Sequence, residues 1–256
     1  MLAFITTNVT LWCTHHNYDD EVIAMNPYEY ALPVPELIER YRRTYSGAVY
    51  DILDEMGYPH QALATELKPV KDHWVIAGPA FTLKGIPDPT GDPSLRERRI
   101  HMFEAMKAAG VPIVDVRDTS FDNQAAHYGE MNATVGAANG VVGAVVDGGS
   151  RDTRFLVDRD FPVFCRYLTP VEAVKRWSYY DWQITVGLRG ALTSVVPVSP
   201  GDFILGDLDG VVVIPKDLTV EVLERTEELV QREDEVRAEF LASPDPVAVY
   251  RKHGRL

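Results

Sequence analysis

The segment GVVGAVVDGGSRD, residues 140–152, begins as a run of small and β-branched residues that predicts a buried strand. Gly148 and Gly149 then give the backbone freedom at the end of the strand. Arg151 and Asp152 can therefore face a cavity while the valines stay in the core. Guanidinium groups bind carboxylates and aspartates bind hard cations, so this pair suits an anionic substrate held beside a metal ion. A surface turn with an exposed ion pair is the alternative interpretation.

A second segment upstream is expected to meet the end of this strand. A polar loop ends near Gly129, and Glu130, Met131 and Asn132 then open a helix of small residues. The N-terminus of a helix offers free N–H groups and the positive end of a dipole, so it forms an anion pocket. The helix leads directly into the buried strand predicted from Gly140 onward. This connection brings both segments to one edge of a sheet, where open α/β layers usually bind ligands.

The composition bounds the class of protein and its partners. The chain has 256 residues, 46% of them hydrophobic and 25% charged, which is typical of a soluble globular protein. A net charge of −13 without a basic stripe argues against a nucleic-acid partner. Cys13 and Cys165 lie far apart in the sequence, so no disulfide framework or thiolate zinc site is indicated, and a cytoplasmic location is expected. No apolar run approaches the roughly 20 residues that span a bilayer, so no membrane partner is expected.

The pattern along the chain predicts one α/β domain with two appendages. We expect a peripheral N-terminal extension at residues 1–32, a single catalytic domain at 33–241 and a C-terminal tail at 242–256. Helices are predicted near 33–41, 46–56, 95–109, 130–138 and 218–241, and strands near 74–83, 111–116, 140–147, 161–165, 184–197, 203–207 and 211–215. Gly78 and Pro79 predict a bulge or bend rather than an uninterrupted central strand.

Two further features have open interpretations. The aromatic segment at 177–182, with Trp177, Tyr179, Tyr180 and Trp182, could line a substrate entrance, but a core or subunit contact is the commoner use of such rings. His127 lies close to Glu130 in the sequence and could assist catalysis, although a lone histidine in a loop is more often structural or exposed.

Four motifs in this order resemble a known family. They are GEMN at 129–132, VVGAVVDGGSRD at 141–152, FPVF at 161–164 and GDFILGDLDGVVVIP at 201–215. The chain is similar over about residues 34–241 to the ribonuclease-activity-regulator A proteins. The same family contains the class II 4-hydroxy-4-methyl-2-oxoglutarate/4-carboxy-4-hydroxy-2-oxoadipate aldolases. The resemblance implies a layered β/β/α swivelling-domain-like fold with a central mixed sheet and a long C-terminal helix. It also implies self-association as a trimer, sometimes paired into a hexamer.

The resemblance also implies a site for Mg²⁺ or Mn²⁺. The metal-binding aspartate of the family falls on Asp152, and the arginine that holds the pyruvyl group falls on Arg151. The acidic residue that reaches the metal through water falls on Glu130. The backbone amides that take the pyruvate carboxylate fall on Met131 and Asn132.

A further acidic residue comes from the C-terminal helix of a neighbouring subunit in this family. It falls on Glu233, again with a contact to the metal through water, and Glu235 is the next choice because the helix has no unique landmark.

These residues predict a divalent-metal-dependent class II aldolase that cleaves a 4-hydroxy-2-oxo diacid to pyruvate and a second oxo acid. A metal ion beside Arg151 stabilises the enolate that forms when the bond breaks. The same enolate arises by decarboxylation, so oxaloacetate is a plausible second substrate. A metal-bound water oriented by Glu130 and Glu233 is the expected base for the C4 hydroxyl. The alternatives are a non-catalytic protein regulator of a ribonuclease, or a metal-dependent lyase or hydratase acting on a bulkier oxo acid.

Overall fold

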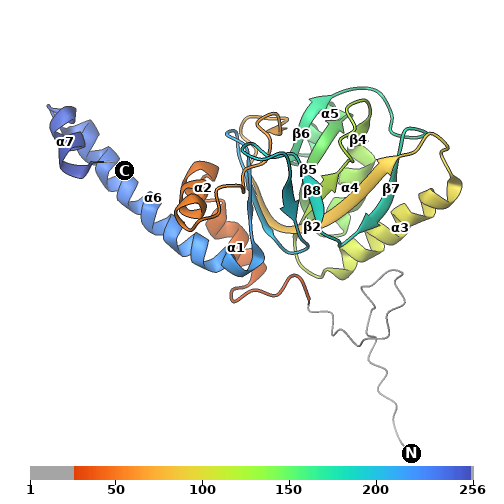
Figure 1. The fold of residues 1–256 in the computed structure, drawn as a ribbon, viewed down its shortest axis with the longest axis horizontal. Coiled ribbons are helices and arrows are strands. Elements are labelled where there is room, and N and C mark those ends of the chain that lie inside the picture. The colour runs from red at the N-terminus through yellow and green to blue at the C-terminus, as the bar shows by residue number, and fades with distance from the viewer. Residues whose placement is uncertain (1–25, 255–256) are drawn as a thin grey trace, which may run out of the picture.

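The computed structural model describes residues 26–254 (Figure 1). Its helices are α1 (Val34–Tyr41), α2 (Ser46–Glu55), α3 (Pro93–Ala108), α4 (Glu130–Ala138), α5 (Thr153–Asp158), the 3₁₀ helix η1 (Lys216–Leu218), α6 (Thr219–Ala242) and α7 (Pro246–His253). Its strands are β1 (Lys68–Pro69), β2 (Ile76–Pro87), β3 (Ile113–Asp118), β4 (Ala126–Tyr128), β5 (Val141–Ser150), β6 (Val163–Leu168), β7 (Trp177–Trp182), β8 (Val186–Leu188), β9 (Val196–Val198), β10 (Phe203–Gly206) and β11 (Val211–Ile214).

The strands form a mixed sheet around a parallel centre. The order along the sheet is β1-β6-β5-β3-β2-β10-β11. Two further strands belong to it, β4, which pairs with β5, and β7, which pairs with β2. The pairs β2–β3, β3–β5 and β5–β6 are parallel, whereas β10 runs antiparallel to both β2 and β11. Almost every residue of β5 is buried, as expected for a parallel strand covered on both faces.

The strand β2 runs from Ile76 to Pro87 without the interruption predicted at Gly78 and Pro79, which lie where its neighbour changes from β10 to β3. Its pairing with β3 begins only at Ala80, and Pro79 pairs with Phe203 of β10 instead. The missing N–H of Pro79 therefore costs no hydrogen bond of the parallel ladder.

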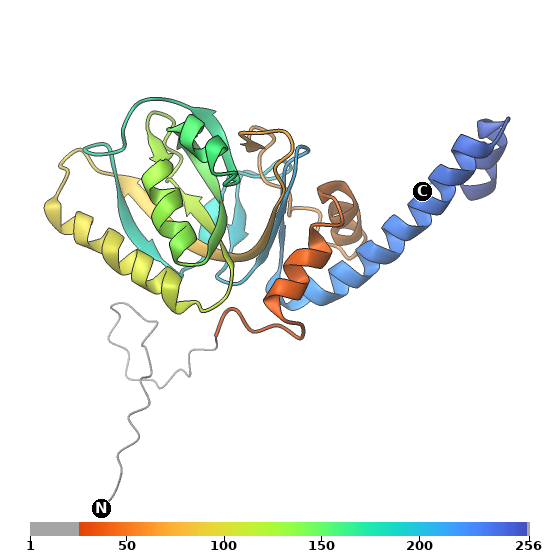
Figure 2. The same ribbon diagram turned by 180° about the vertical axis from the view of Figure 1, so that it is seen from behind.

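Helices cover one face of the sheet and a small second sheet covers the other. α3, α4 and α5 lie together on the first face (Figure 2), where Met102, Met106 and Leu156 are among the residues that pack with the strands. On the opposite face, the two-stranded sheet of β8 and β9 contributes Val186, Val196 and other residues to a second apolar cluster. The fold is thus the predicted mixed α/β fold with a long C-terminal helix.

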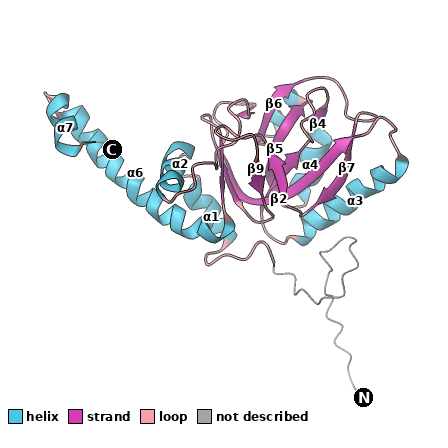
Figure 3. Ribbon diagram, viewed as in Figure 1, coloured by secondary structure: helices cyan, strands magenta, loops and turns pink. Residues whose placement is uncertain are grey.

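A third cluster joins the sheet to helices at its β11 edge. α1, α2 and the first part of α6 pack on β10 and β11 around Tyr41, Phe203 and Val222. α6 then leaves this cluster and extends away from the body of the molecule (Figure 3). None of the helices in the described part of the chain has the length and apolar character needed to cross a membrane.

Described residues of both predicted appendages make contacts with the rest of the chain. Residues 1–25 of the N-terminal extension lie outside the described residues, but Tyr28 is buried and its hydroxyl accepts a hydrogen bond of 2.6 Å from Gln183 Nε2. Residues 242–256 were expected to form a tail, yet α7 lies there and turns back on α6. Its Lys252 and His253 contact Glu239, at 2.9 and 2.7 Å. The aspartate at position 245 caps this helix, which two prolines in the sequence had obscured.

Candidate active site

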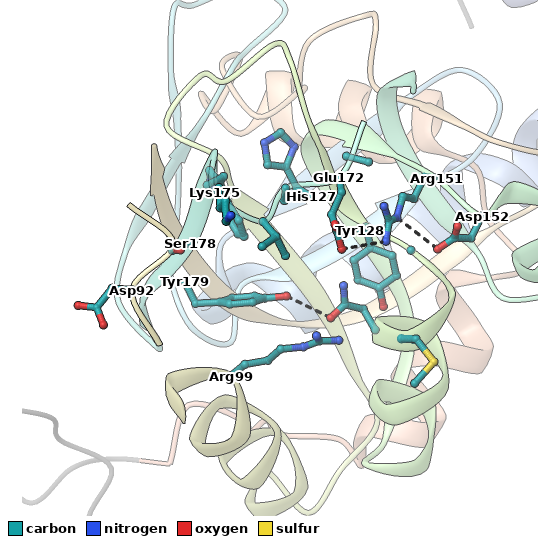
Figure 4. Close-up of a pocket in the computed structure, with 18 of the residues that line it drawn as sticks. Asp92, Arg99, His127, Tyr128, Arg151, Asp152, Glu172, Lys175, Ser178 and Tyr179 are labelled. Carbon is teal, nitrogen blue, oxygen red and sulfur yellow. Dashed lines mark hydrogen bonds and ion pairs between the residues drawn. The ribbon is translucent and has the colours of Figure 1, made fainter. Parts of the chain in front are cut away.

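A cavity of about 390 Å³ opens beside the start of α4 (Figure 4). The β4 strand, the first turn of α4 and the end of β5 form one side of it. The segment that leads into β7, β7 itself and α3 form the other. Among the residues that line the cavity are Arg99, His127, Gly129, Met131, Asn132, Arg151, Asp152, Glu172, Lys175, Trp177 and Tyr179.

The end of β5 places Asp152 at the N-terminus of α4, as the sequence predicts. The backbone of Asp152 lies in the left-handed region, with φ at 59°, directly before α5. Its Oδ2 accepts a hydrogen bond from the backbone N–H of Glu130 at 3.3 Å. A Cβ atom on Gly129 would lie only 2.6 Å from the same oxygen, so this position needs a glycine for Asp152 to sit where it does.

Arg151 lies between two carboxylates at the rim of the cavity. Its Nε is 3.5 Å from Asp152 Oδ2, and its Nη2 is 3.4 Å from Glu172 Oε1 (Figure 4). About a third of its side chain is exposed, so the guanidinium is accessible from the cavity. Glu172 was not predicted from the sequence, because it comes from the segment between β6 and β7.

The first turn of α4 presents backbone N–H groups rather than the Glu130 carboxylate. Glu130 Oε1 accepts a hydrogen bond from Thr134 at 2.7 Å and forms an ion pair with Arg159 at 3.3 Å. The N–H groups of Glu130 and Ala133 are bonded, whereas no hydrogen bond to a described residue occupies those of Met131 and Asn132. These two groups are available to an anion.

Glu233 and Glu235 lie on α6, outside the cavity of their own chain. Glu233 accepts a hydrogen bond from the Tyr45 hydroxyl and lies 3.9 Å from Arg237. Figure 1 places α6 on the opposite side of the sheet from α4 and β7. Within a single chain the structure therefore brings together Arg151, Asp152 and the start of α4, but not the predicted glutamate of the C-terminal helix.

A buried arginine holds the floor of the cavity together. Arg117 is fully buried, and its Nη2 contacts Asp115 Oδ2 at 2.6 Å. Its Nη1 donates to the hydroxyl of Tyr179 at 3.2 Å, and that hydroxyl donates to Asn132 Oδ1 at 3.1 Å. β3 thereby fixes the position of β7 relative to the first turn of α4. The sequence contains a signal for this pair, since Asp115 and Arg117 share one face of a buried strand.

His127 has a structural environment. Its Nδ1 accepts the backbone N–H of Gly149 at 3.1 Å, and its Nε2 lies 3.0 Å from Asp122 Oδ2. Burial lowers the pKa of His127 to about 4, against the opposing effect of Asp122. The imidazole is therefore neutral at pH 7 and supports the glycine turn at the end of β5.

The oxygen atoms around Asp152 fit a hard divalent cation. About 37% of the Asp152 side chain is exposed, and its Oδ1 makes no hydrogen bond or ion pair with a described residue. Mg²⁺ is commonly held by one or two carboxylates together with water and substrate oxygens. No group of three or more acidic, histidine or cysteine side chains converges among the described residues, so water and substrate oxygens would supply most ligands of such an ion.

Comparisons with known proteins identify similar sequences and structures. A Halalkalibacterium halodurans protein named "Putative 4-hydroxy-4-methyl-2-oxoglutarate aldolase" is 31% identical over 202 residues, 79% of this chain and 87% of that protein. A crystal structure described as "novel cellulases from microbes associated with the gut ecosystem" has a TM-score of 0.74 and 33% identity, and covers 81% of this chain and 89% of its own.

Streptomyces coelicolor RraAS2 is described as an unusual member of the RNase ES inhibitor RraA protein family. Its structure has a TM-score of 0.67 at 23% identity and covers 82% of this chain and 99% of its own, which shows the shared fold alone. The model of the RraA-like family, described as Aldolase/RraA, matches residues 46–213. Because this match spans well over half of the chain, the protein belongs to the RraA-like family.

Proposed function

We propose that this protein is a divalent-metal-dependent aldolase that cleaves a 4-hydroxy-2-oxo diacid to pyruvate and a second oxo acid. The observation that carries the proposal is the meeting of Asp152, Arg151 and the open N–H groups of α4 in one cavity. The aldolase name of the H. halodurans relative supports the same reaction class.

The first turn of α4 binds the carboxylate of the pyruvyl group. The N–H groups of Met131 and Asn132 face this carboxylate, and the dipole of the helix adds to the attraction. Arg151 donates to the keto oxygen and thereby stabilises the negative charge that develops there as the C3–C4 bond breaks. Glu172 holds the Arg151 guanidinium from the other side and limits its movement.

Asp152 would hold a Mg²⁺ or Mn²⁺ ion, which supplies Lewis-acid stabilisation of the developing enolate charge. Gly129 and the N–H of Glu130 keep the Asp152 carboxylate at the opening of α4. Glu172 is the carboxylate of this chain that can accept the C4 hydroxyl proton, and Glu233 of a neighbouring subunit is the second candidate. Decarboxylation of oxaloacetate gives the same enolate and is the expected side reaction.

The test is an assay of pyruvate formation. Purified protein with Mg²⁺ and 4-hydroxy-4-methyl-2-oxoglutarate is coupled to lactate dehydrogenase, and the loss of NADH is followed. We expect Asp152→Asn and Arg151→Gln to lower kcat/KM by at least about 100-fold, as removal of groups that stabilise transition-state charge usually does.

The matched control makes the same change of charge at a position away from the cavity. Asp158→Asn alters an exposed carboxylate on α5 that pairs only with Arg154 among the described residues, and we expect wild-type rates. Wild-type rates in Asp152→Asn and Arg151→Gln would show that the site is wrongly assigned. Stable binding to a ribonuclease without turnover of any oxo acid would favour the regulator instead.

A further inference from the structure

Arg99 of α3 lines the same cavity and has no acidic partner among the described residues. Its Nε is buried, and no hydrogen bond or ion pair joins the side chain to a described residue. Its guanidinium lies over the ring of Phe103, with 5.6 Å between Cζ and the ring centroid. Burial of a guanidinium donor without an acceptor costs free energy, so the position suits an external acceptor.

Arg151 also lines the cavity and has acidic partners, as do Arg117 and Arg159, which do not line it. Arg151 contacts Asp152 and Glu172, Arg117 contacts Asp115, and Arg159 contacts Glu130. Acidic residues are not scarce, since the chain has 38 of them against 25 lysines and arginines. That no carboxylate of the described part of the chain contacts Arg99 is therefore a local property of the cavity rather than a result of composition.

Arg99 and Arg151 lie on different sides of the cavity. In Figure 4, Arg99 is below Tyr179 and Arg151 is above it, and the hydrogen bond between Tyr179 and Asn132 lies between them. The rings of Trp177 and Tyr179 line the cavity as well. A volume of about 390 Å³ falls in the range of roughly 300–1,000 Å³ of small-molecule sites and leaves room for more than a pyruvyl group.

Lys175 adds a second positive charge at the mouth of the cavity. It is exposed, its backbone φ is 63°, and a Cβ atom on Gly91 would lie 2.8 Å from its Cγ. The stem of the lysine therefore packs over a glycine that leaves it room. An approaching anion meets this charge before it reaches Arg99.

We propose that Arg99 forms a second anion site, which binds an oxyanion at the far end of the substrate and so selects 2-oxo acids with two anionic ends. The inference rests on the proposed function for the position of the pyruvyl end. A guanidinium binds a carboxylate or a phosphate through two parallel hydrogen bonds, and both are oxyanions of the required class. The aromatic walls contact the uncharged carbons between the two ends.

The test is direct binding by calorimetry to the full-length protein with Mg²⁺. The probes are 2-oxoglutarate, its phosphonate counterpart 2-oxo-4-phosphonobutyrate, and 2-oxopentanoate, which lacks the distal anion. We expect Arg99→Gln to weaken binding of the preferred dianion about 10- to 100-fold, the usual effect of losing a charge-assisted pair. Binding of 2-oxopentanoate stays within about twofold, which also shows that the variant is folded. The stronger of the two dianions identifies a carboxylate or a phosphate as the natural group.

Arg98→Gln is the matched control. Arg98 is the neighbouring arginine on α3, but it donates to the carbonyl of Tyr180 and does not line the cavity. We expect it to bind all three probes as the wild type does. Arg99→Lys keeps the charge but loses the two-pronged geometry, and it should fall between the wild type and Arg99→Gln.

Equal affinity of wild type and Arg99→Gln for both dianions would overturn the inference, as would failure of the wild type to bind either dianion. These outcomes are separate from the fate of the aldolase proposal. Arg99-dependent binding without any pyruvate formation keeps the second site and removes the reaction. Pyruvate formation with Arg99-independent binding does the reverse.

Discussion

A single buried histidine in the wall of the cavity makes the stability of the protein depend on pH. Nδ1 of His127 accepts the N–H of Gly149, which only an unprotonated Nδ1 can do, and burial lowers the pKa of the ring to about 4. The unfolded chain, in which the pKa of histidine is about 6.5, binds this proton first as the pH falls. The contribution of the neutral His127 to the free energy of unfolding is therefore fully present above about pH 6.5 and is lost as the pH falls towards 4.

We expect the wild type to lose about 3 kcal/mol more of its free energy of unfolding than His127→Gln between pH 7 and pH 4. Urea unfolding at a series of pH values measures this difference. His73→Gln serves as control, since 71% of that side chain is exposed, and it should follow the wild-type curve. If the free energies of unfolding of the wild type and His127→Gln fell in parallel, another group would be responsible for the loss of stability at acid pH.

Which site residues could be predicted depends on how they are connected. Arg151, Asp152 and the start of α4 are joined by one helix and one strand, so local patterns suffice to bring them together. Glu172 and Arg99 reach the cavity from the segment before β7 and from α3, and only tertiary packing places them there. Tyr179 of β7 belongs to the aromatic segment for which the sequence left a place at the substrate entrance open. For Glu130, an ion pair with Arg159, which directly follows α5, occupies the side chain, and no local pattern indicates this contact.

At the scale of elements, the junction of α4 with the end of β5 depends on a glycine. The φ of Gly129 is −170°, an extended conformation that alanine also adopts, so Gly129→Ala introduces no backbone strain. Its Cβ would instead lie 2.6 Å from Asp152 Oδ2 and displace that flexible carboxylate. The backbone junction should persist while the carboxylate moves.

We expect Gly129→Ala to weaken Mn²⁺ binding and kcat/KM by at least about 10-fold, while the free energy of unfolding changes by less than about 1 kcal/mol. Mn²⁺ titration followed by electron paramagnetic resonance and urea unfolding measure the two quantities. Gly47→Ala within α2 is the control, because its Cβ would meet only the Tyr45 ring at 3.4 Å. Unchanged Mn²⁺ affinity in Gly129→Ala would contradict a metal role for Asp152.

Elements with a strong period or a continuous apolar run were predictable, and the others were not. The valines of β5 and the long charged pattern of α6 predict the observed strand and helix. Residues 184–197 were predicted as strand material, but they contain only β8 and the start of β9, joined by a loop. Their small sheet is stabilised by packing on the opposite sheet face, a contact between segments far apart in the chain.

At the scale of the whole molecule, the projecting end of α6 and the helix α7 after it carry exposed apolar side chains. Leu241, Val247 and Tyr250 are 84%, 57% and 59% exposed. The cavity of one chain has no acidic residue from this helix. Both observations have one explanation if α6 of one subunit reaches the cavity of the next within a closed ring.

We therefore expect Asp152→Asn and Glu233→Gln to be nearly inactive alone but to complement each other when they assemble together. A site that takes Asp152 from one variant and Glu233 from the other is complete. Random mixing makes about a quarter of all sites complete, and removal of rings that contain a single variant raises this share. Differently tagged chains, co-expressed and purified through both tags, give the mixed assembly for the NADH-coupled assay. Glu235→Gln in place of Glu233→Gln decides which glutamate takes part. If the glutamate acted within its own chain, the mixed assembly would contain no complete site, because every chain carries one of the two substitutions. Recovered activity thus requires that α6 complete the cavity of a neighbour.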